Sequence, residues 1–197
     1  QSSSRPLIIV GSGVKLANAE KEAVDFIKRT NIPCVTSWPA IDLFDSDFDQ
    51  LVGSCGTSAN RPGNFATQSC DLLISLGCRL NGLITGNNAS NFATNALKIM
   101  VDIDESEINK DNGVVIDIPI NIDLKNFFDC LIDEDFNGGD ISIWIDRINT
   151  WKKRYPICLP EYYSEKKNVN PYVFMEILSK ETKKDTILIV DTGATLV

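Results

Sequence analysis

The sequence predicts an α/β protein with a doubly wound, mostly parallel sheet and helices on both faces. Two observations support this fold class: short apolar runs without polar alternation, and amphipathic segments of helical period between them. Strands that are apolar on both faces are typical of a parallel sheet covered on both sides. We expect this domain to span residues 5–135, followed by a linker with a helix over 136–168 and a truncated βα unit over 169–197.

The first half of the predicted domain begins with the apolar run 7–10, a buried strand that ends at the turn Gly11-Ser12-Gly13. Apolar residues then recur at helical spacing from Leu16 to Arg29, which predicts an amphipathic helix. The same alternation continues with a strand over 33–37, an acidic loop over 42–50, a Gly-punctuated loop over 53–63 and a helix over 64–70.

Three more buried strands are predicted in the second half, each ending at a residue that breaks the apolar run. They cover 72–76, 97–101 and 114–118, and they end at Gly77, Asp102 and Pro119. A helix over 121–134 completes the domain.

The C-terminal part begins after the breaker Asn137-Gly138-Gly139, with a helix over 141–155 and an exposed linker over 156–168. Asn170 is a good N-cap and Pro171 fits the first helical position, so we expect a helix over 171–182. A strand over 186–190 would follow. Both ends of the sequence fall inside such units, and we expect the chain to be a fragment of a longer polypeptide.

The composition excludes several classes of function. The chain of 197 residues carries 27 acidic and 19 basic side chains, a formal net charge of −8, and its basic runs are short. This balance argues against nucleic-acid or anionic-membrane partners, which require clustered Lys and Arg. The sequence contains no His, so triads with a His base and His-ligated zinc are excluded for this chain.

The six cysteines form no C-x-x-C pair and no zinc-like doublets. Several lie in apolar strings, as Cys70 and Cys130 do, and we interpret them as reduced core thiols. We find no apolar segment that resembles a signal peptide or is long enough to span a bilayer. We therefore expect a cytoplasmic protein.

The turn Gly11-Ser12-Gly13 is the first candidate binding site. Glycines after a strand let backbone N–H groups approach a phosphate at the start of a helix. The full dinucleotide fingerprint is absent, because its third Gly would fall at Leu16 and no acidic residue closes the second strand. A phosphate cradle and a plain tight turn both remain open.

Two further candidates follow predicted strands. Arg79 would stand at the carboxyl edge of the sheet, where it meets either a ligand phosphate or a neighbouring carboxylate. Asp102 and Asp104 lie on the same side of a pleat and suit either ribose hydroxyls or the cap of the helix that follows. The acidic loop 42–50 has the composition of a metal loop but lacks the Gly and terminal Glu of a calcium site, which favours a solvated turn.

A series of short strings carries a resemblance that no single motif provides: 53–57, 60–61, 64–66, 69–80, 85–86, 92–93, 98–104 and 107–110. In this order they resemble the central domain of thiamine-diphosphate-dependent 2-oxo acid enzymes, and most closely that of acetolactate synthase large subunits. Residues 170–174 and 189–193 resemble the start of the family's diphosphate-binding domain. The similarity covers nearly the whole chain.

The resemblance implies a full-length enzyme that decarboxylates a 2-oxo acid such as pyruvate and transfers the acyl carbanion to an acceptor, using thiamine diphosphate and Mg²⁺. It implies a homodimer or homotetramer acting on small molecules. In the family, the activating glutamate and the magnesium motif lie in regions outside this chain. No residue here is therefore expected to be catalytic or to bind a metal, and the fragment alone should be inert.

The resemblance also implies cofactor-binding positions. On the central domain these would hold FAD: Gly11, Gly13, Gly56, Thr57, Gly77, Arg79, Asp102 and Asp104. Gly193, Ala194 and Thr195 would form the first edge of the diphosphate site. Departures from the family include Cys55 in place of a His and Gly82-Leu83-Ile84 in place of a more polar stretch. The alternative is a non-catalytic domain that binds FAD or another nucleotide, or that serves as a scaffold for the catalytic domains.

Overall fold

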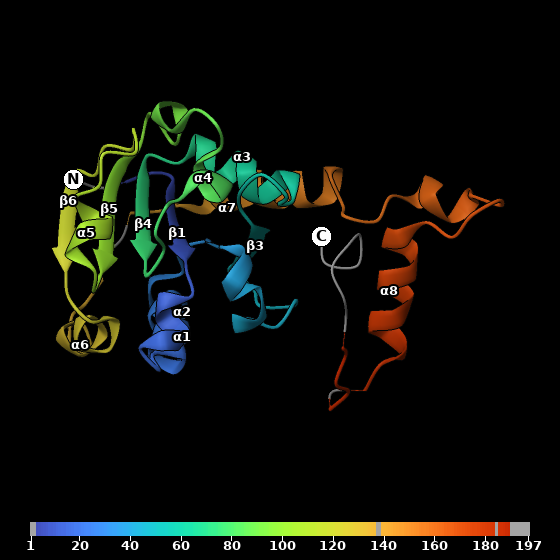
Figure 1. Cartoon of the computed structure of the whole chain (residues 1–197), viewed down its shortest axis with the longest axis horizontal. Coiled ribbons are helices and arrows are strands. Elements are labelled where there is room, and N and C mark those ends of the chain that lie inside the picture. The colour runs from blue at the N-terminus through green and yellow to red at the C-terminus, as the bar shows by residue number, and fades with distance from the viewer. Residues whose placement is uncertain (1–2, 137–138, 184, 190–197) are drawn as a thin grey trace. The chain divides into compact units, whose positions relative to one another are not determined.

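The structure is a computed structural model that describes residues 3–136, 139–183 and 185–189 (Figure 1). The chain divides into two compact units, residues 1–152 and residues 153–197. The first unit holds a six-stranded sheet, and its strands β1, β4, β5 and β6 point the same way in Figure 1. None of the described helices is long and apolar enough to cross a membrane.

All strand pairs in the sheet are parallel. The strands are β1 (Pro6–Val10), β2 (Cys34–Thr36), β3 (Leu51–Ser54), β4 (Leu72–Leu76), β5 (Leu97–Asp102) and β6 (Ile118–Asn121). Their order is β3-β2-β1-β4-β5-β6. The direction of winding therefore reverses between β1 and β4, and this switch point is where doubly wound sheets usually bind ligands.

Helices cover both faces of the sheet, as the sequence predicts. The α-helices are α1 (Gly13–Leu16), α2 (Glu20–Thr30), α3 (Arg61–Ser69), α4 (Gly82–Thr85), α5 (Glu105–Ile108), α6 (Leu124–Cys130), α7 (Ser142–Arg154) and α8 (Pro171–Glu181), with short 3₁₀ turns at Trp38–Leu43, Ala89–Asn91 and Pro160–Ser164. Leu7 and Ile9 of β1 pack in the core that contains α3 and α7 residues, while Ile8 and Val10 pack in the core with α2 and α6. The predicted α/β fold class is confirmed.

In the sheet, one strand prediction is wrong and one strand was missed. The strand expected over 114–118 lies instead at Ile118–Asn121 and includes Pro119, which pairs with Met100. Pro is tolerated there because β6 is an edge strand, with β5 as its one neighbour among the described strands. Strand β3 was not predicted, since only two apolar residues precede Gly53 and the strand is half-buried at the other edge.

Smaller differences concern helix ends, the second unit and one cysteine. The helix expected from Leu16 to Arg29 is two helices, and Leu16 ends the first with its side chain exposed. Residues 185–189 have no strand geometry, and Val190 lies outside the described residues. Cys130 is exposed rather than in the core, whereas burial raises the pKa of the Cys34 thiol to about 12.

Asp71, which directly precedes β4, holds the chain that enters β1. Its carboxylate accepts hydrogen bonds from the backbone N–H of Arg5 at 2.9 Å, from the hydroxyl of Ser4 at 2.7 Å and from the hydroxyl of Ser3. Partial burial raises the pKa of Asp71, but these hydrogen bonds outweigh it and hold the value at about 2. The charged carboxylate thus fixes the start of β1 beside the start of β4.

We expect this carboxylate to make stability depend on pH. Because its pKa is lower in the folded chain than the ordinary 3.8, its contribution is present above pH 4 and is lost as pH falls towards 2. Asp71→Asn should lower the free energy of unfolding at neutral pH and flatten its pH dependence in that window. Urea unfolding between pH 2 and 7 measures both, and the exposed Asp45→Asn serves as control. An unchanged pH profile in Asp71→Asn would contradict this role.

Trp144 fixes α7 to the first unit. Its side chain is 2% exposed, its Nε1–H donates to the carbonyl of Pro6 at 3.0 Å, and its ring meets that of Trp151 edge-on at 5.8 Å. The contact joins residues far apart in the sequence, the first strand and a helix near the end of the unit. Helix α7 up to Lys152 therefore belongs to the same compact unit as the sheet.

Replacing this side chain should cost much of the unit's stability. Trp144→Ala is expected to lower the free energy of unfolding by about 3–5 kcal/mol, because it leaves a cavity in the core. Trp144→Phe should cost about 1–3 kcal/mol, since the Pro6 carbonyl loses its donor. The neighbouring Ile143 is 85% exposed, so Ile143→Ala should stay within about 0.5 kcal/mol. Equal effects at both positions in denaturant titrations would rule out the anchoring role.

Candidate functional site

The candidate site is the crevice at the switch point, where the turns after β1, β2 and β4 meet. It is a cleft of about 120 Å³ lined by Ser12, Ser37, Trp38, Arg79, Leu83 and their neighbours. The parallel register places Val10 beside Leu76, so the two turns leave the sheet at the same level. The structure thus brings together the predicted Gly11–Gly13 and Gly77–Arg79 turns.

The glycines of these turns are required by the contact between the turns themselves. A Cβ on Gly11 would lie 2.1 Å from the carbonyl oxygen of Gly77, and one on Gly13 would lie 2.7 Å from the Gly77 Cα. Gly77 has φ +57°, a conformation that favours glycine. The Gly11 N–H donates to Leu76 at 2.9 Å and the Gly13 N–H donates to Gly77 at 3.0 Å.

Gly56 and Thr57 lie in the loop after β3, which is tied to the segment after β4. The side-chain amide of Asn64 both accepts from the Gly56 N–H and donates to the Gly56 carbonyl, each at 2.9 Å. The Thr57 N–H donates to the carbonyl of Leu83 at 2.8 Å. Strands β3 and β4 are three places apart in the sheet, roughly 14 Å, so the two loops meet across the carboxyl ends of the strands between them, β2 and β1.

We call residues 80–86, which contain α4, the strap. Leu80 at its start is 2% exposed and has φ +47°, and its carbonyl accepts from the side chain of Asn112 at 3.0 Å. Asn81 caps α4 by accepting from the Leu83 N–H at 3.1 Å. The strap is therefore held from two sides, by the loop after β3 and by the segment after α5.

Arg79 projects from the crevice rim, and its side chain is 66% exposed. Its guanidinium lies 3.5 Å from Glu107, whose carboxylate also pairs with Lys110 at 2.6 Å. An exposed ion pair at that distance contributes little to stability. The sequence left two partners open for Arg79, a ligand phosphate and a neighbouring carboxylate. In the structure Arg79 lies beside the carboxylate of Glu107 and also lines the crevice.

Asp102 and Asp104 act on the backbone that begins α5. Asp102 is 8% exposed and its Oδ1 accepts from the Asp104 N–H at 3.0 Å. Asp104 is the N-cap and accepts from the Ser106 hydroxyl at 2.6 Å and from its N–H at 2.9 Å. The hydrogen bond from the Ser106 hydroxyl, followed by that from the Ser106 N–H, lowers the pKa of Asp104. Of the two alternatives that the sequence left open, the structure shows helix capping by Asp104.

The remaining predicted positions do not join this site. Asp42 in the acidic loop pairs with Lys15 at 2.6 Å, and that hydrogen bond lowers its pKa. Among the described residues no group of three acidic, thiol or imidazole side chains is placed to hold a metal ion. Gly193, Ala194 and Thr195 lie outside the described residues.

The sequence reasoning missed the asparagines that shape the crevice. Asn60 caps α3 by accepting from the Gly63 N–H at 2.9 Å, and Asn before Arg61-Pro62 is a recognisable helix-start signal. The roles of Asn64 and Asn112 have no such local signal. Their partners are backbone groups of loops whose curvature depends on the rest of the fold.

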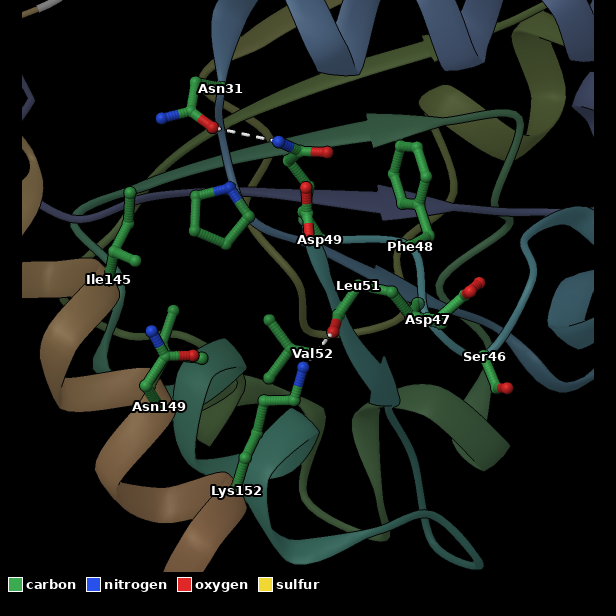
Figure 2. A pocket seen from close by; sticks show the side chains of 13 residues that line it. Asn31, Ser46, Asp47, Phe48, Asp49, Leu51, Val52, Ile145, Asn149 and Lys152 are labelled. Carbon is green, nitrogen blue, oxygen red and sulfur yellow. Dashed lines mark hydrogen bonds between the residues drawn. The ribbon is translucent and has the colours of Figure 1, made fainter.

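A second pocket lies at the opposite, amino-terminal edge of β2 and β3. Figure 2 shows its lining, a cavity of about 370 Å³ that includes Asn31, Phe48 and Lys152. The Lys152 ammonium donates to the carbonyl of Leu51 at 2.9 Å, and Gln50 donates to Asn31 at 2.9 Å. Ligands of open parallel sheets bind outside the carboxyl ends of the strands, so the smaller crevice remains the candidate site.

Comparison with known proteins agrees with this fold. Residues 1–131 match the family "Thiamine pyrophosphate enzyme, central domain". The chain is 35% identical over 163 residues to a probable acetolactate synthase large subunit of Methanococcus aeolicus, covering 77% of this chain and 27% of that protein. It is 33% identical over 193 residues to the acetolactate synthase large subunit of Pyropia yezoensis, covering 91% of this chain and 30% of that protein.

A probable acetolactate synthase large subunit of Methanocaldococcus jannaschii is 33% identical over 199 residues, covering 97% of this chain and 33% of that protein. The chain therefore spans at most a third of the length of each of these three relatives.

Substitution by Ala should change stability in opposite directions at two glycines, Gly56 beside the strap and Gly82 within it. Gly56 has φ +125° and its Cβ would lie 2.4 Å from the Leu83 carbonyl oxygen, so Gly56→Ala should destabilise the chain by about 1–3 kcal/mol. Gly82 lies in α4 with no atom within 4 Å of its Cβ position, and Gly82→Ala should stabilise it by about 0.4–1 kcal/mol. Denaturant unfolding compares the two, and a neutral Gly56→Ala would show that the loops are not in contact.

Proposed function

Because the chain belongs to the thiamine pyrophosphate enzyme family, as its central domain, we propose that the whole protein is a thiamine-diphosphate-dependent enzyme resembling acetolactate synthase. It decarboxylates a 2-oxo acid such as pyruvate and transfers the acyl carbanion to an acceptor. The observation that carries this proposal is the similarity to acetolactate synthase large subunits over 77–97% of the chain. In this proposal the enzyme is cytoplasmic and assembles as a homodimer or homotetramer.

The cofactors of the whole protein are thiamine diphosphate and Mg²⁺. Thiamine diphosphate, when bound, supplies carbanion stabilisation to the substrate. In this proposal the magnesium site lies in a part of the protein outside this chain, as the family resemblance implies. Residues 169–197 are the start of the diphosphate-binding domain in this proposal, with Gly193, Ala194 and Thr195 at the edge of its site.

The described residues of the first unit have a scaffold role in this enzyme. Every residue of β1 is buried, and the turns after β1 and β4 are in van der Waals contact, so the carboxyl edge of the sheet is rigid. A rigid edge can hold catalytic domains at a fixed separation, as productive geometry requires. The two hypotheses are thus compatible: the whole protein can be an enzyme while this domain serves it as a non-catalytic scaffold.

The 197-residue chain alone should therefore be inactive. With pyruvate, thiamine diphosphate and Mg²⁺ we expect CO₂ release from the whole protein and none from the isolated chain. Calorimetry should detect no tight, magnesium-dependent binding of thiamine diphosphate to the isolated chain, because it lacks a metal-ligand cluster in its described part. Micromolar binding there would contradict the scaffold assignment, and a whole protein inert toward 2-oxo acids would contradict the proposed activity.

A further inference from the structure

We infer that the switch-point crevice is closed by the chain's own strap, residues 80–86, and that this central domain takes no flavin or adenine dinucleotide there. The resemblance to acetolactate synthases makes FAD the cofactor to test against the geometry. The proposed thiamine-diphosphate chemistry of the whole protein does not depend on the outcome. Three features of the crevice argue against the fit: its volume, its backbone donors and its charge.

The volume of the cleft is too small for a dinucleotide. The cleft measures about 120 Å³, whereas pockets for drug-sized ligands run to about 300–1,000 Å³. A dinucleotide is larger than such a ligand. The strap takes up room at this site, because Asn81, Leu83 and Ile84 line the cleft together with Trp38 and Pro39.

The strap cannot leave without breaking buried and polar contacts on both sides of the crevice. The Thr57 N–H holds its middle through the Leu83 carbonyl, and Asn112 holds its start through the Leu80 carbonyl. The Leu80 side chain is in the core at 2% exposure. Gly56, itself fixed by Asn64, packs directly under the Leu83 carbonyl. The closed position is therefore fixed by several independent contacts.

The backbone donors expected to meet phosphates already have acceptors. The Gly11 N–H donates to Leu76 and the Gly13 N–H donates to Gly77, so neither points at open space. A phosphate at a helix start needs such groups free. The helix that follows, α1, spans only Gly13–Leu16, so few aligned peptide dipoles add to the field there.

The charges around the crevice also fail to suit a diphosphate. Among the described residues that line the cleft, Arg79 is the one cation, and it lies beside Glu107. Lys110 is bound to the same Glu107 and donates to the Arg79 carbonyl. Each carboxylate expected to hold a ribose uses its Oδ1 to hold the start of α5, since Asp104 accepts from Ser106 and Asp102 accepts from the Asp104 N–H.

The test measures flavin content and flavin binding in the purified whole protein. Acid or heat release should yield no flavin from the protein as isolated, and a fluorescence titration with FAD, repeated by calorimetry with NAD⁺, should show no saturable binding. The Arg79→Ala variant is titrated in parallel. Flavin that co-purifies or binds saturably, and whose binding Arg79→Ala weakens by about tenfold or more, would overturn the inference.

Amide exchange locates any ligand that does bind. In the free protein the Thr57 amide should exchange much more slowly than an open loop amide, because it donates to the strap. Fast exchange at Thr57 would show an open strap and contradict closure. FAD binding that leaves exchange over 77–86 unchanged and is insensitive to Arg79→Ala would place the ligand at another site and support a closed crevice. All these readouts are independent of 2-oxo acid turnover.

Discussion

The contact between the turns that follow β1 and β4 constrains the rest of the first unit. The two strands pair in parallel with Val10 beside Leu76, so their turns leave the sheet side by side. There is no space between them for a Cβ on Gly11 or Gly13, and Gly77 must adopt a positive φ. Every residue of β1 is buried under helices from both faces, which gives the contact a fixed base.

The same glycine pattern that admits a phosphate in many doubly wound folds therefore serves an intramolecular contact in this chain. Fold and ligand are separable, because a fold sets where the strand ends lie while the loops decide what space remains between them. Here the loops after β3 and β4 meet through Thr57 and Leu83, and the space left is a narrow cleft. The family membership of the chain and the closure of its crevice are thus two independent properties.

Several aspartates of this chain hold backbone groups in place. Asp104 caps α5, and Asp123 caps α6 by accepting from the Lys125 N–H at 2.9 Å. The Asp71 carboxylate accepts hydrogen bonds from N–H and hydroxyl groups of the residues that precede β1. A carboxylate at a helix start or an open strand end satisfies donors that have no ladder partner, and in these positions a negative charge is stabilised locally.

The sequence by itself determined the fold class and most elements, because continuous apolar runs and helical periodicity are local patterns that survive in any context. The family came from a resemblance carried by a series of short strings between residues 53 and 110. It also identified Asn170 and Pro171 as the start of α8. Only the tertiary structure decided that β6 includes Pro119 and that the crevice is closed by the strap. Each of these depends on neighbours far away in the chain: an edge position tolerates a proline, and the room left in the cleft depends on loops that meet across the sheet. Local propensity carries no information about such distances, so packing alone settles them.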